Sequence, residues 1–100
     1  MNINFEYKDV SASKRLEGLV AEKLNKLEDK FDFIVSMDVY FKAEKTSSDQ
    51  TGKIIEIRAN VPGKTLFTET SQGTYEAAIA KASSEIQTQL QKKKEKMQTH

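Results

Sequence analysis

The residues with the most distinctive spacing in this sequence are lysines of one helical segment. At about 100° per residue, Lys23, Lys26 and Lys30 fall on one flank of an apolar stripe. Glu17 and Glu28 fall on the opposite flank. Lysines gathered in this way can contact consecutive phosphates of a nucleic acid without acidic neighbours between them. Lysines beside a core stripe also lay their aliphatic chains over apolar neighbours, so the spacing alone leaves both interpretations open.

A second basic group lies near the C-terminus. Residues 81–100 hold five lysines and two glutamates, a net charge of +3, although the whole chain has a formal net charge of only +1. Lys81, Lys92 and Lys96 share one flank of the helix expected there, and the other lysines surround its end. Binding of RNA and offsetting of the helix macrodipole would both use this charge. The predicted RNA-binding set is Lys23, Lys26, Lys30, Lys81, Lys92, Lys93, Lys94 and Lys96.

Other kinds of site have little support in the sequence. The only histidine is His100, and the absence of cysteine excludes disulfides and thiolate metal sites. The carboxylates are scattered, without metal-ligand spacing, and there is no glycine-rich loop for a phosphate. We therefore predict no catalytic activity, no cofactor, no metal ion and no small-molecule substrate. Tyr40 and Arg58 could stack on a base, but such residues on a sheet more often pair across strands.

The length and the hydropathy pattern limit how the chain can be organised. One hundred residues suffice for one hydrophobic core, so we expect a single domain over residues 1–100, with a lysine-rich helix end at about residues 92–100. The N-terminus has no basic segment followed by an apolar run. No segment approaches the roughly 20 apolar residues that cross a bilayer. We therefore expect a cytoplasmic protein without a membrane partner.

Two apolar periodicities predict the elements that position these lysines. Alternation of apolar and polar residues predicts strands, and apolar residues at helical spacing predict amphipathic helices. Ser11 or Ser13 can cap the first helix, and Pro62 with Gly63 forms a tight turn between two strands. The predicted elements are a strand at 2–7, a helix at about 12–30, strands at 35–42, 55–61 and 64–70, and a helix from near Thr74 whose apolar stripe is Tyr75, Ile79, Ala82, Ile86, Leu90 and Met97.

This order predicts an α+β fold, β-α-β-β-β-α. A right-handed crossover through the first helix makes the first two strands parallel neighbours, and short connections make the other pairs antiparallel. A four-stranded mixed sheet with two helices packed on one face follows. Whether Leu66 or Phe67 faces the core stays open, and Lys93 lies on the apolar stripe, so the last helix should run past the sheet. The other face should meet water through Ser36, Asp38, Tyr40, Lys42, Glu56, Arg58 and Asn60.

Three segments resemble one protein family. Residues 20–27, VAEKLNKL, look like its V-x-x-K/R-L-x-K-L pattern and place Lys23 and Lys26 on the basic positions. Residues 61–67, VPGKTLF, resemble its P-G-x-x-L hairpin, and residues 77–92 follow its last helix. Over its whole length the chain is similar to the ribosome hibernation promoting factors and ribosome-associated inhibitors, also called subunit-interface proteins.

The resemblance implies a translation inhibitor that binds the small ribosomal subunit and its ribosomal RNA. Such proteins occupy the channel of mRNA and tRNA anticodon arms, and they keep ribosomes inactive during stress or stationary phase. By resemblance, the basic faces of both helices contact the RNA. The chain resembles the short form of the family, so we expect no further C-terminal domain that pairs two ribosomes.

The sequence also departs from the family pattern. The family's D-M-Y before the last helix is Thr74-Tyr75-Glu76 here, so Thr74 would take the capping role. Two positions that are basic in its K-L-x-R-Q-L-x-K pattern are Glu85 and Thr88, which lowers the positive charge of this helix. A general double-stranded-RNA-binding module is one alternative, although such modules usually carry lysines at the start of their last helix. A protein-interaction domain without a nucleic-acid role is the other, and the near-zero net charge favours it.

Overall fold

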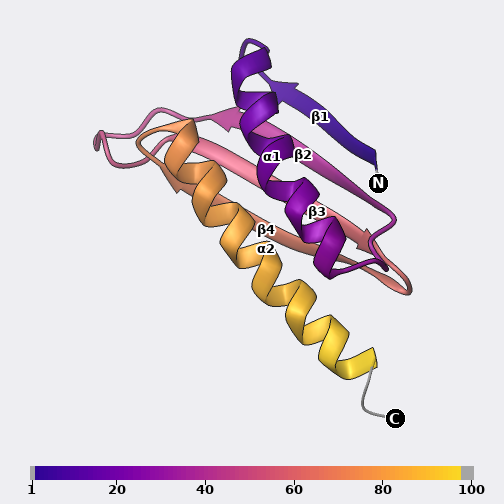
Figure 1. Cartoon of the computed structure of the whole chain (residues 1–100). Coiled ribbons are helices and arrows are strands. Elements are labelled where there is room, and N and C mark those ends of the chain that lie inside the picture. Colours follow the sequence, from indigo (N-terminus) through magenta and orange to yellow (C-terminus); the bar gives the residue numbers. More distant parts are fainter. Residues whose placement is uncertain (1, 98–100) are drawn as a thin grey trace.

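The computed structural model describes residues 2–97, which form a four-stranded sheet covered on one face by two helices (Figure 1). The predicted α+β class and the β-α-β-β-β-α order are confirmed. His100 and residues 98–100 of the predicted lysine-rich end lie outside the described residues. The elements are β1 (Asn2–Lys8), α1 (Lys14–Lys30), β2 (Ser36–Ala43), β3 (Lys53–Val61), β4 (Lys64–Gln72) and α2 (Tyr75–Met97).

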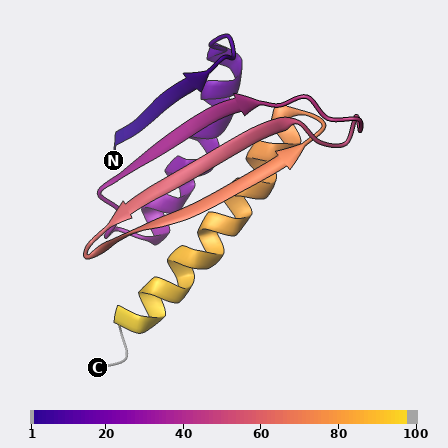
Figure 2. The same cartoon turned by 180° about the vertical axis from the view of Figure 1, so that it is seen from behind.

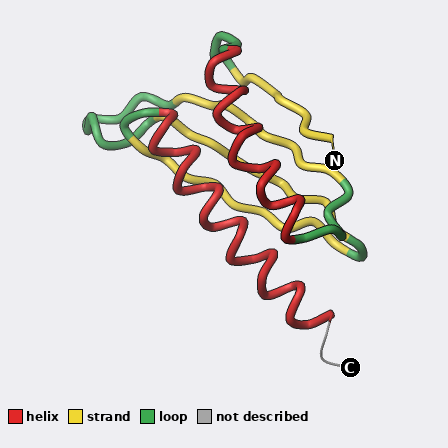
Figure 3. Tube along the Cα trace, viewed as in Figure 1, coloured by secondary structure: helices red, strands yellow, loops and turns green. Residues whose placement is uncertain are grey.

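The strands lie in the sheet in the order of the sequence, β1-β2-β3-β4 (Figure 3). β1 and β2 are parallel, with Phe5 opposite Val39, and α1 forms the crossover between them. The β2–β3 and β3–β4 pairs are antiparallel, with Val39 opposite Ile57 and Ile57 opposite Thr68. Seen from behind, the sheet lies in front of both helices and its outer face is not covered by them (Figure 2). The predicted mixed topology is therefore confirmed.

Hydroxyl side chains set the start of both helices. The Leu16 N–H donates to the Ser13 hydroxyl at 3.2 Å, so Ser13 is the cap of α1 and the helix begins two residues later than predicted. The Ala77 N–H donates to the Thr74 hydroxyl at 3.1 Å, which confirms the predicted capping role of Thr74. Capping satisfies backbone N–H groups that have no partner within the helix.

The core lies between the inner sheet face and the apolar stripes of both helices. Leu66 is 7% exposed and Phe67 is 49% exposed, so Leu66 faces the core. Alternation along the predicted strand at 35–42 would put Val35 on the same face as the buried Met37, but Val35 is 64% exposed, so this part of the prediction was wrong. The strand begins only at Ser36, so the pleat does not orient Val35, and Ile34 is buried in its place. The buried apolar side chains of the helices are Leu16, Val20, Leu24, Leu27, Ala78, Ile79, Ala82, Ile86 and Leu90.

The C-terminal part of α2 extends past the sheet, as predicted (Figure 1). Leu90 is the last fully buried residue of the helix. Lys93 continues the apolar stripe and is half-buried, and Met97, the last residue of α2, is 39% exposed. This end of the helix therefore presents lysines without a sheet beneath them.

The outer sheet face differs from the prediction at one residue. Glu56 was expected to meet water, but it is only 2% exposed. Lys42 Nζ contacts its carboxylate, and Arg58 Nε donates to the same carboxylate at 2.6 Å. Long cationic side chains lie over their neighbours in this way while their charges stay near the surface. Burial alone would raise the pKa of Glu56, but the hydrogen bonds from Lys42 and Arg58 outweigh it and hold the pKa below its ordinary value.

Candidate nucleic-acid interface

A groove of about 330 Å³ lies between α1 and α2. Lys23, Lys26 and Lys30 of α1 line one wall, with Leu27 beside them. The other wall consists of small or uncharged polar residues of α2. None of these lining residues is acidic. The α2 residues that line the groove are Ala80, Ser83, Ser84 and Gln87.

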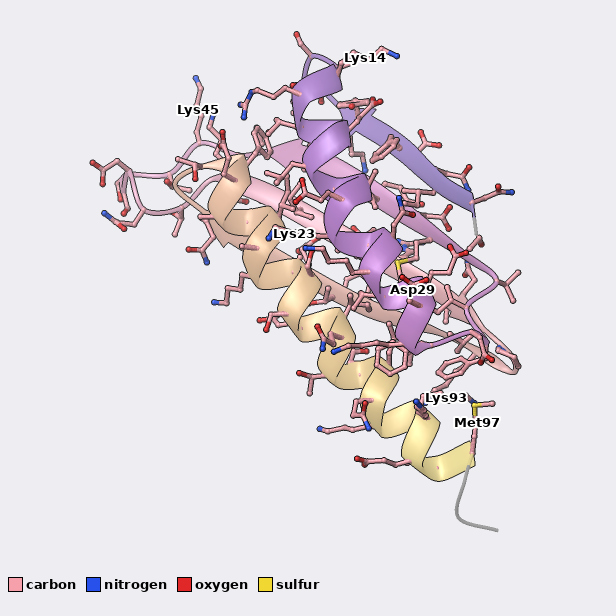
Figure 4. All side chains as sticks on the ribbon, viewed as in Figure 1. Lys14, Lys23, Asp29, Lys45, Lys93 and Met97 are labelled. Carbon is pink, nitrogen blue, oxygen red and sulfur yellow. The ribbon has the colours of Figure 1, made fainter. Side chains whose placement is uncertain are left out.

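The two flanks of α1 face different neighbours, and this places the lysines. Tyr7 of β1 donates its hydroxyl to the Glu17 carboxylate, so this acidic residue lies toward the first strand. The lysines, on the other flank, line the groove toward α2, and Figure 4 shows Lys23 between the two helices. The predicted segregation of charge across α1 therefore coincides with the two sides of the packed helix. Because the buried stripe of α1 anchors the helix, the backbone that carries these lysines is held in place.

The groove lysines keep their charges uncompensated within the described chain. Among residues 2–97, Lys23, Lys26 and Lys30 form no ion pair with a carboxylate. Arg15, by contrast, pairs with Glu76 of α2 at 2.9 Å. Ser83 adds a buried hydroxyl without a hydrogen-bond partner in this part of the chain. Lysines without an ion-pair partner form a surface that suits the oxygens of a phosphate.

The acidic departure from the family pattern does not reach the groove. The carboxylate of Glu85 accepts a hydrogen bond from the Thr68 hydroxyl of β4, so Glu85 faces the edge of the sheet. The amide of Gln89, on the same flank of α2, donates to the Phe67 carbonyl at 2.6 Å. Thr88 donates its hydroxyl to the Ser84 carbonyl at 3.2 Å. These side chains of α2 therefore satisfy backbone and side-chain groups of β4 and α2.

Five of the eight predicted site lysines do not line the groove, and two of these, Lys81 and Lys94, lie apart from the other three. Lys81 is exposed on α2. Lys94 Nζ donates to the Lys30 carbonyl at 3.3 Å and lies 5.8 Å from the centre of the Phe31 ring. The last carbonyls of a helix have no partner within it, so Lys94 caps the C-terminus of α1 and links it to α2.

The remaining predicted lysines gather at the overhanging end of α2, with one residue that the sequence analysis missed. Lys92, Lys93 and Lys96 line a hollow of about 140 Å³ together with Lys64, the first residue of β4. Figure 4 shows Lys93 at this end of the helix. The alternation of β4 could have indicated the direction of Lys64, because alternation places Lys64 on the same face of the strand as Leu66. While the choice between Leu66 and Phe67 was open, the direction of Lys64 was open too.

Two observations on the described residues concern metal ions and membranes. No group of three or more histidine, cysteine, aspartate or glutamate residues within 2–97 could hold a metal ion. No helix in the same range is long and apolar enough to cross a membrane. The candidate site is formed by the basic surfaces around α2 that are described above.

The chain is similar to proteins named for the ribosome. It is 29% identical over 99 residues to the ribosome hibernation promoting factor of Pseudomonas putida strain KT2440, an alignment that covers 99% of this chain and 92% of the relative. A ribosomal subunit interface protein from Coxiella burnetii has a similar fold, with a TM-score of 0.79 and 22% identity over 94% of this chain and 98% of that one.

A second solved structure shares the fold. The Protein Y N-terminal domain of Thermus thermophilus superimposes with a TM-score of 0.75 and 22% identity, covering 92% of this chain and 98% of that one. The family match covers nearly all of the sequence, residues 3–98. The chain belongs to the family of the Sigma 54 modulation protein / S30EA ribosomal protein.

Proposed function

We propose that this chain binds the small ribosomal subunit and inhibits translation, with the groove between α1 and α2 against phosphates of ribosomal RNA. The observation that carries this proposal is the groove itself, where Lys23, Lys26 and Lys30 face uncharged residues and no acid. Lysines that neutralise phosphates release condensed counterions, and this release drives binding. Family membership supports the ribosome as the source of the RNA, because similar proteins are named as a ribosome hibernation promoting factor and a subunit interface protein.

The inhibition would follow from occupancy and not from catalysis. A domain that fills the channel of mRNA and tRNA anticodon arms excludes both, so the ribosome stays inactive while the protein is bound. Residues 1–100 would act as one ribosome-binding domain in the cytoplasm, without cofactor or small-molecule substrate. Lys81 and Lys94 remain predicted RNA contacts outside the groove.

Rigidity of the groove supports this function. Leu24 and Leu27 are buried in the core, and they hold α1 in the orientation that turns Lys23 and Lys26 toward α2. Binding therefore orders only side chains, and less conformational entropy is lost than in a flexible segment. The buried Ser83 hydroxyl would gain a partner when a phosphate oxygen or a bridging water enters the groove.

The start of α2 argues against a general double-stranded-RNA-binding module. Such a module brings lysines and a helix N-terminus to the phosphates. Here the first turn of α2 carries Glu76, which pairs with Arg15, and the lysines lie toward the other end of the helix. A negative charge at this position repels phosphate.

Co-sedimentation with purified small subunits, large subunits and duplex RNA across a salt series tests the proposal. We expect retention on small subunits alone. If three lysine–phosphate contacts form, affinity should fall roughly 40-fold between 50 and 200 mM salt. Small subunits preloaded with mRNA and tRNA should retain less protein. Equal retention on duplex RNA, or retention that salt does not change, would reject the groove as a ribosome-specific phosphate site.

A further inference from the structure

A second lysine cluster lies on the other flank of α2, separate from the groove. Its hollow of about 140 Å³ is lined by Lys64 of β4 and three lysines of α2, with Leu66 and Gln89 completing the wall. The groove is on the flank toward α1 and shares no lining residue with this hollow. No carboxylate lines either of them. The α2 lysines of this cluster are Lys92, Lys93 and Lys96.

The hairpin between β3 and β4 delivers Lys64 to this cluster. Val61 is paired with Lys64, so only Pro62 and Gly63 form the turn, and Gly63 has the positive φ of +85° that such a turn requires. Lys64 lies two residues before the buried Leu66 and therefore points to the helix side of the sheet. It meets α2 where the helix overhangs the sheet, beyond Leu90. The position is set by the backbone and not by a flexible tail.

The cluster gathers positive charge from two elements. Lys92 and Lys93 of α2 meet Lys64, the first residue of β4, and Lys96 follows one turn after Lys92 on the helix. Phosphates bound here would displace counterions from these lysines.

We infer that Lys64, Lys92, Lys93 and Lys96 form a second phosphate-binding site, which holds a stretch of RNA backbone distinct from the stretch in the groove. The inference rests on the proposed function, because the RNA is that of the same small subunit. The two sites lie on opposite flanks of α2, the groove along its middle and the second site near its end, so α2 would lie between two RNA segments. Because Lys64 comes from β4, two elements build this site, which distinguishes it from a helix end that is only basic.

Substitution of Lys64 tests the site, with Lys45 as a matched control. Lys45 is an exposed lysine in the loop at the opposite end of the molecule (Figure 4). Lys64→Ala should weaken small-subunit binding about threefold to tenfold at 0.15 M salt and lower the salt slope by about 1, because one phosphate contact is lost. Lys64→Arg should restore both values, and Lys45→Ala should change neither. The inference fails if Lys64→Ala binds as Lys45→Ala does.

The same variants separate this inference from the proposed function. If the parent protein does not bind small subunits, the proposed function fails. The site is then decided with a 16-nucleotide single-stranded RNA, on which Lys64→Ala must bind more weakly than Lys45→Ala. Equal binding of these two variants to the oligonucleotide rejects the site as well. All variants are compared by thermal melting, since both positions are exposed and should tolerate alanine.

Radical probing tests whether the two RNA segments are distinct. The chain has no cysteine, so Met97→Cys, one turn after Lys93, and Glu22→Cys, one turn before Lys26, each give one attachment point for an iron chelate. Both residues are exposed. On small subunits the two probes should cleave ribosomal RNA at different segments. Cleavage of the same nucleotides by both probes would show a single binding surface and overturn the two-segment inference.

Discussion

Cations on the two faces of this molecule differ in what they contact. On the outer sheet face, Lys42 and Arg58 both bind the buried carboxylate of Glu56, and Lys42 also pairs with Glu69 at 3.1 Å. Between the helices, by contrast, Lys23 and its neighbours in the groove have no ion-pair partner among residues 2–97. The sheet cations stabilise the folded structure, whereas the groove cations are available for the proposed contact with RNA. Positive charge alone therefore does not identify a binding surface, and the position of the acids does.

The aromatic residues of the outer face follow the same rule. The Arg58 guanidinium lies 5.0 Å from the centre of the Tyr40 ring and 6.0 Å from that of Phe67. Tyr40 and Arg58, considered above as a base-stacking pair, thus contact each other across neighbouring strands. Cross-strand contacts of this kind stabilise sheets. The aromatic and cationic side chains of the outer face therefore interact with one another.

The largest expected effect on binding comes from reversing charge in the groove. Lys23→Glu with Lys26→Glu should weaken small-subunit binding more than about 100-fold, because two contacts are lost and two repulsions are added. The free energy of unfolding should change by about 1 kcal/mol or less, since neither lysine has a partner to lose. The matched control is Lys14→Glu with Lys45→Glu, two lysines at the opposite end of the molecule (Figure 4). Normal binding by the groove variant would remove the distinction between the two faces.

A smaller effect, on stability instead of binding, is expected on the outer face. Lys42→Met leaves the buried Glu56 with one cationic partner, which should cost about 1 to 3 kcal/mol of unfolding free energy. Urea unfolding measures this loss, with Lys45→Met as an exposed control. Small-subunit binding should stay within about twofold of the parent value. A variant that melts normally and binds poorly would assign Lys42 to the interface.

Acid should weaken the outer face in a way that depends on Glu56. Its pKa in the folded protein lies below the ordinary value of 4.5, so the stability it contributes is present above pH 4.5 and is lost as the pH falls toward the folded pKa. The difference in unfolding free energy between the parent and Glu56→Gln should therefore shrink below about pH 4.5. Urea unfolding at a series of pH values measures it. A difference that stays constant down to pH 3 would contradict the lowered pKa.

The smallest expected effect concerns Lys94, which belongs neither to the paired cations of the outer sheet face nor to the lysines of the groove. Lys94→Met removes the cap on the Lys30 carbonyl and should cost about 0.3 to 1 kcal/mol. Small-subunit binding should weaken only about twofold to threefold, through a less restrained end of the groove. Lys94→Arg, which can still donate to the carbonyl, should restore the stability. A loss of binding above tenfold without a loss of stability would show that contact with RNA, and not capping of α1, is the main role of Lys94.

The elements and their order were predictable from the sequence alone. Periods of two and about 3.6 residues follow from local backbone geometry, so every strand and helix end that was predicted lies within two residues of its observed position. The lysine flank of α1 was predictable for the same reason, because the spacing of Lys23, Lys26 and Lys30 sets their side of the helix. The parallel pairing of β1 and β2 followed from the handedness of the crossover.

In β4 the local pattern was not sufficient to predict which side chains are buried. Thr68 and Thr70 are buried, and α2 accepts their hydroxyl hydrogen bonds through Glu85 and the Ala78 carbonyl. Polar residues thus lie on both faces of β4, and alternation could not decide between Leu66 and Phe67. The partners that make these threonines tolerable in the core come from a distant part of the chain.

Tertiary structure alone decided which groups lie opposite each charge. Glu56 is buried beneath Arg58 of the same strand and Lys42 of β2, and the alternation of β3 does not indicate the contact with Lys42. The position of Lys64 beside the lysines of α2 depends on where the hairpin ends and how far the helix overhangs. The physical reason is common to these cases. Periodicity assigns a side chain to a face, but electrostatic and hydrogen-bonding roles depend on distances between residues far apart in sequence, and only packing sets those distances.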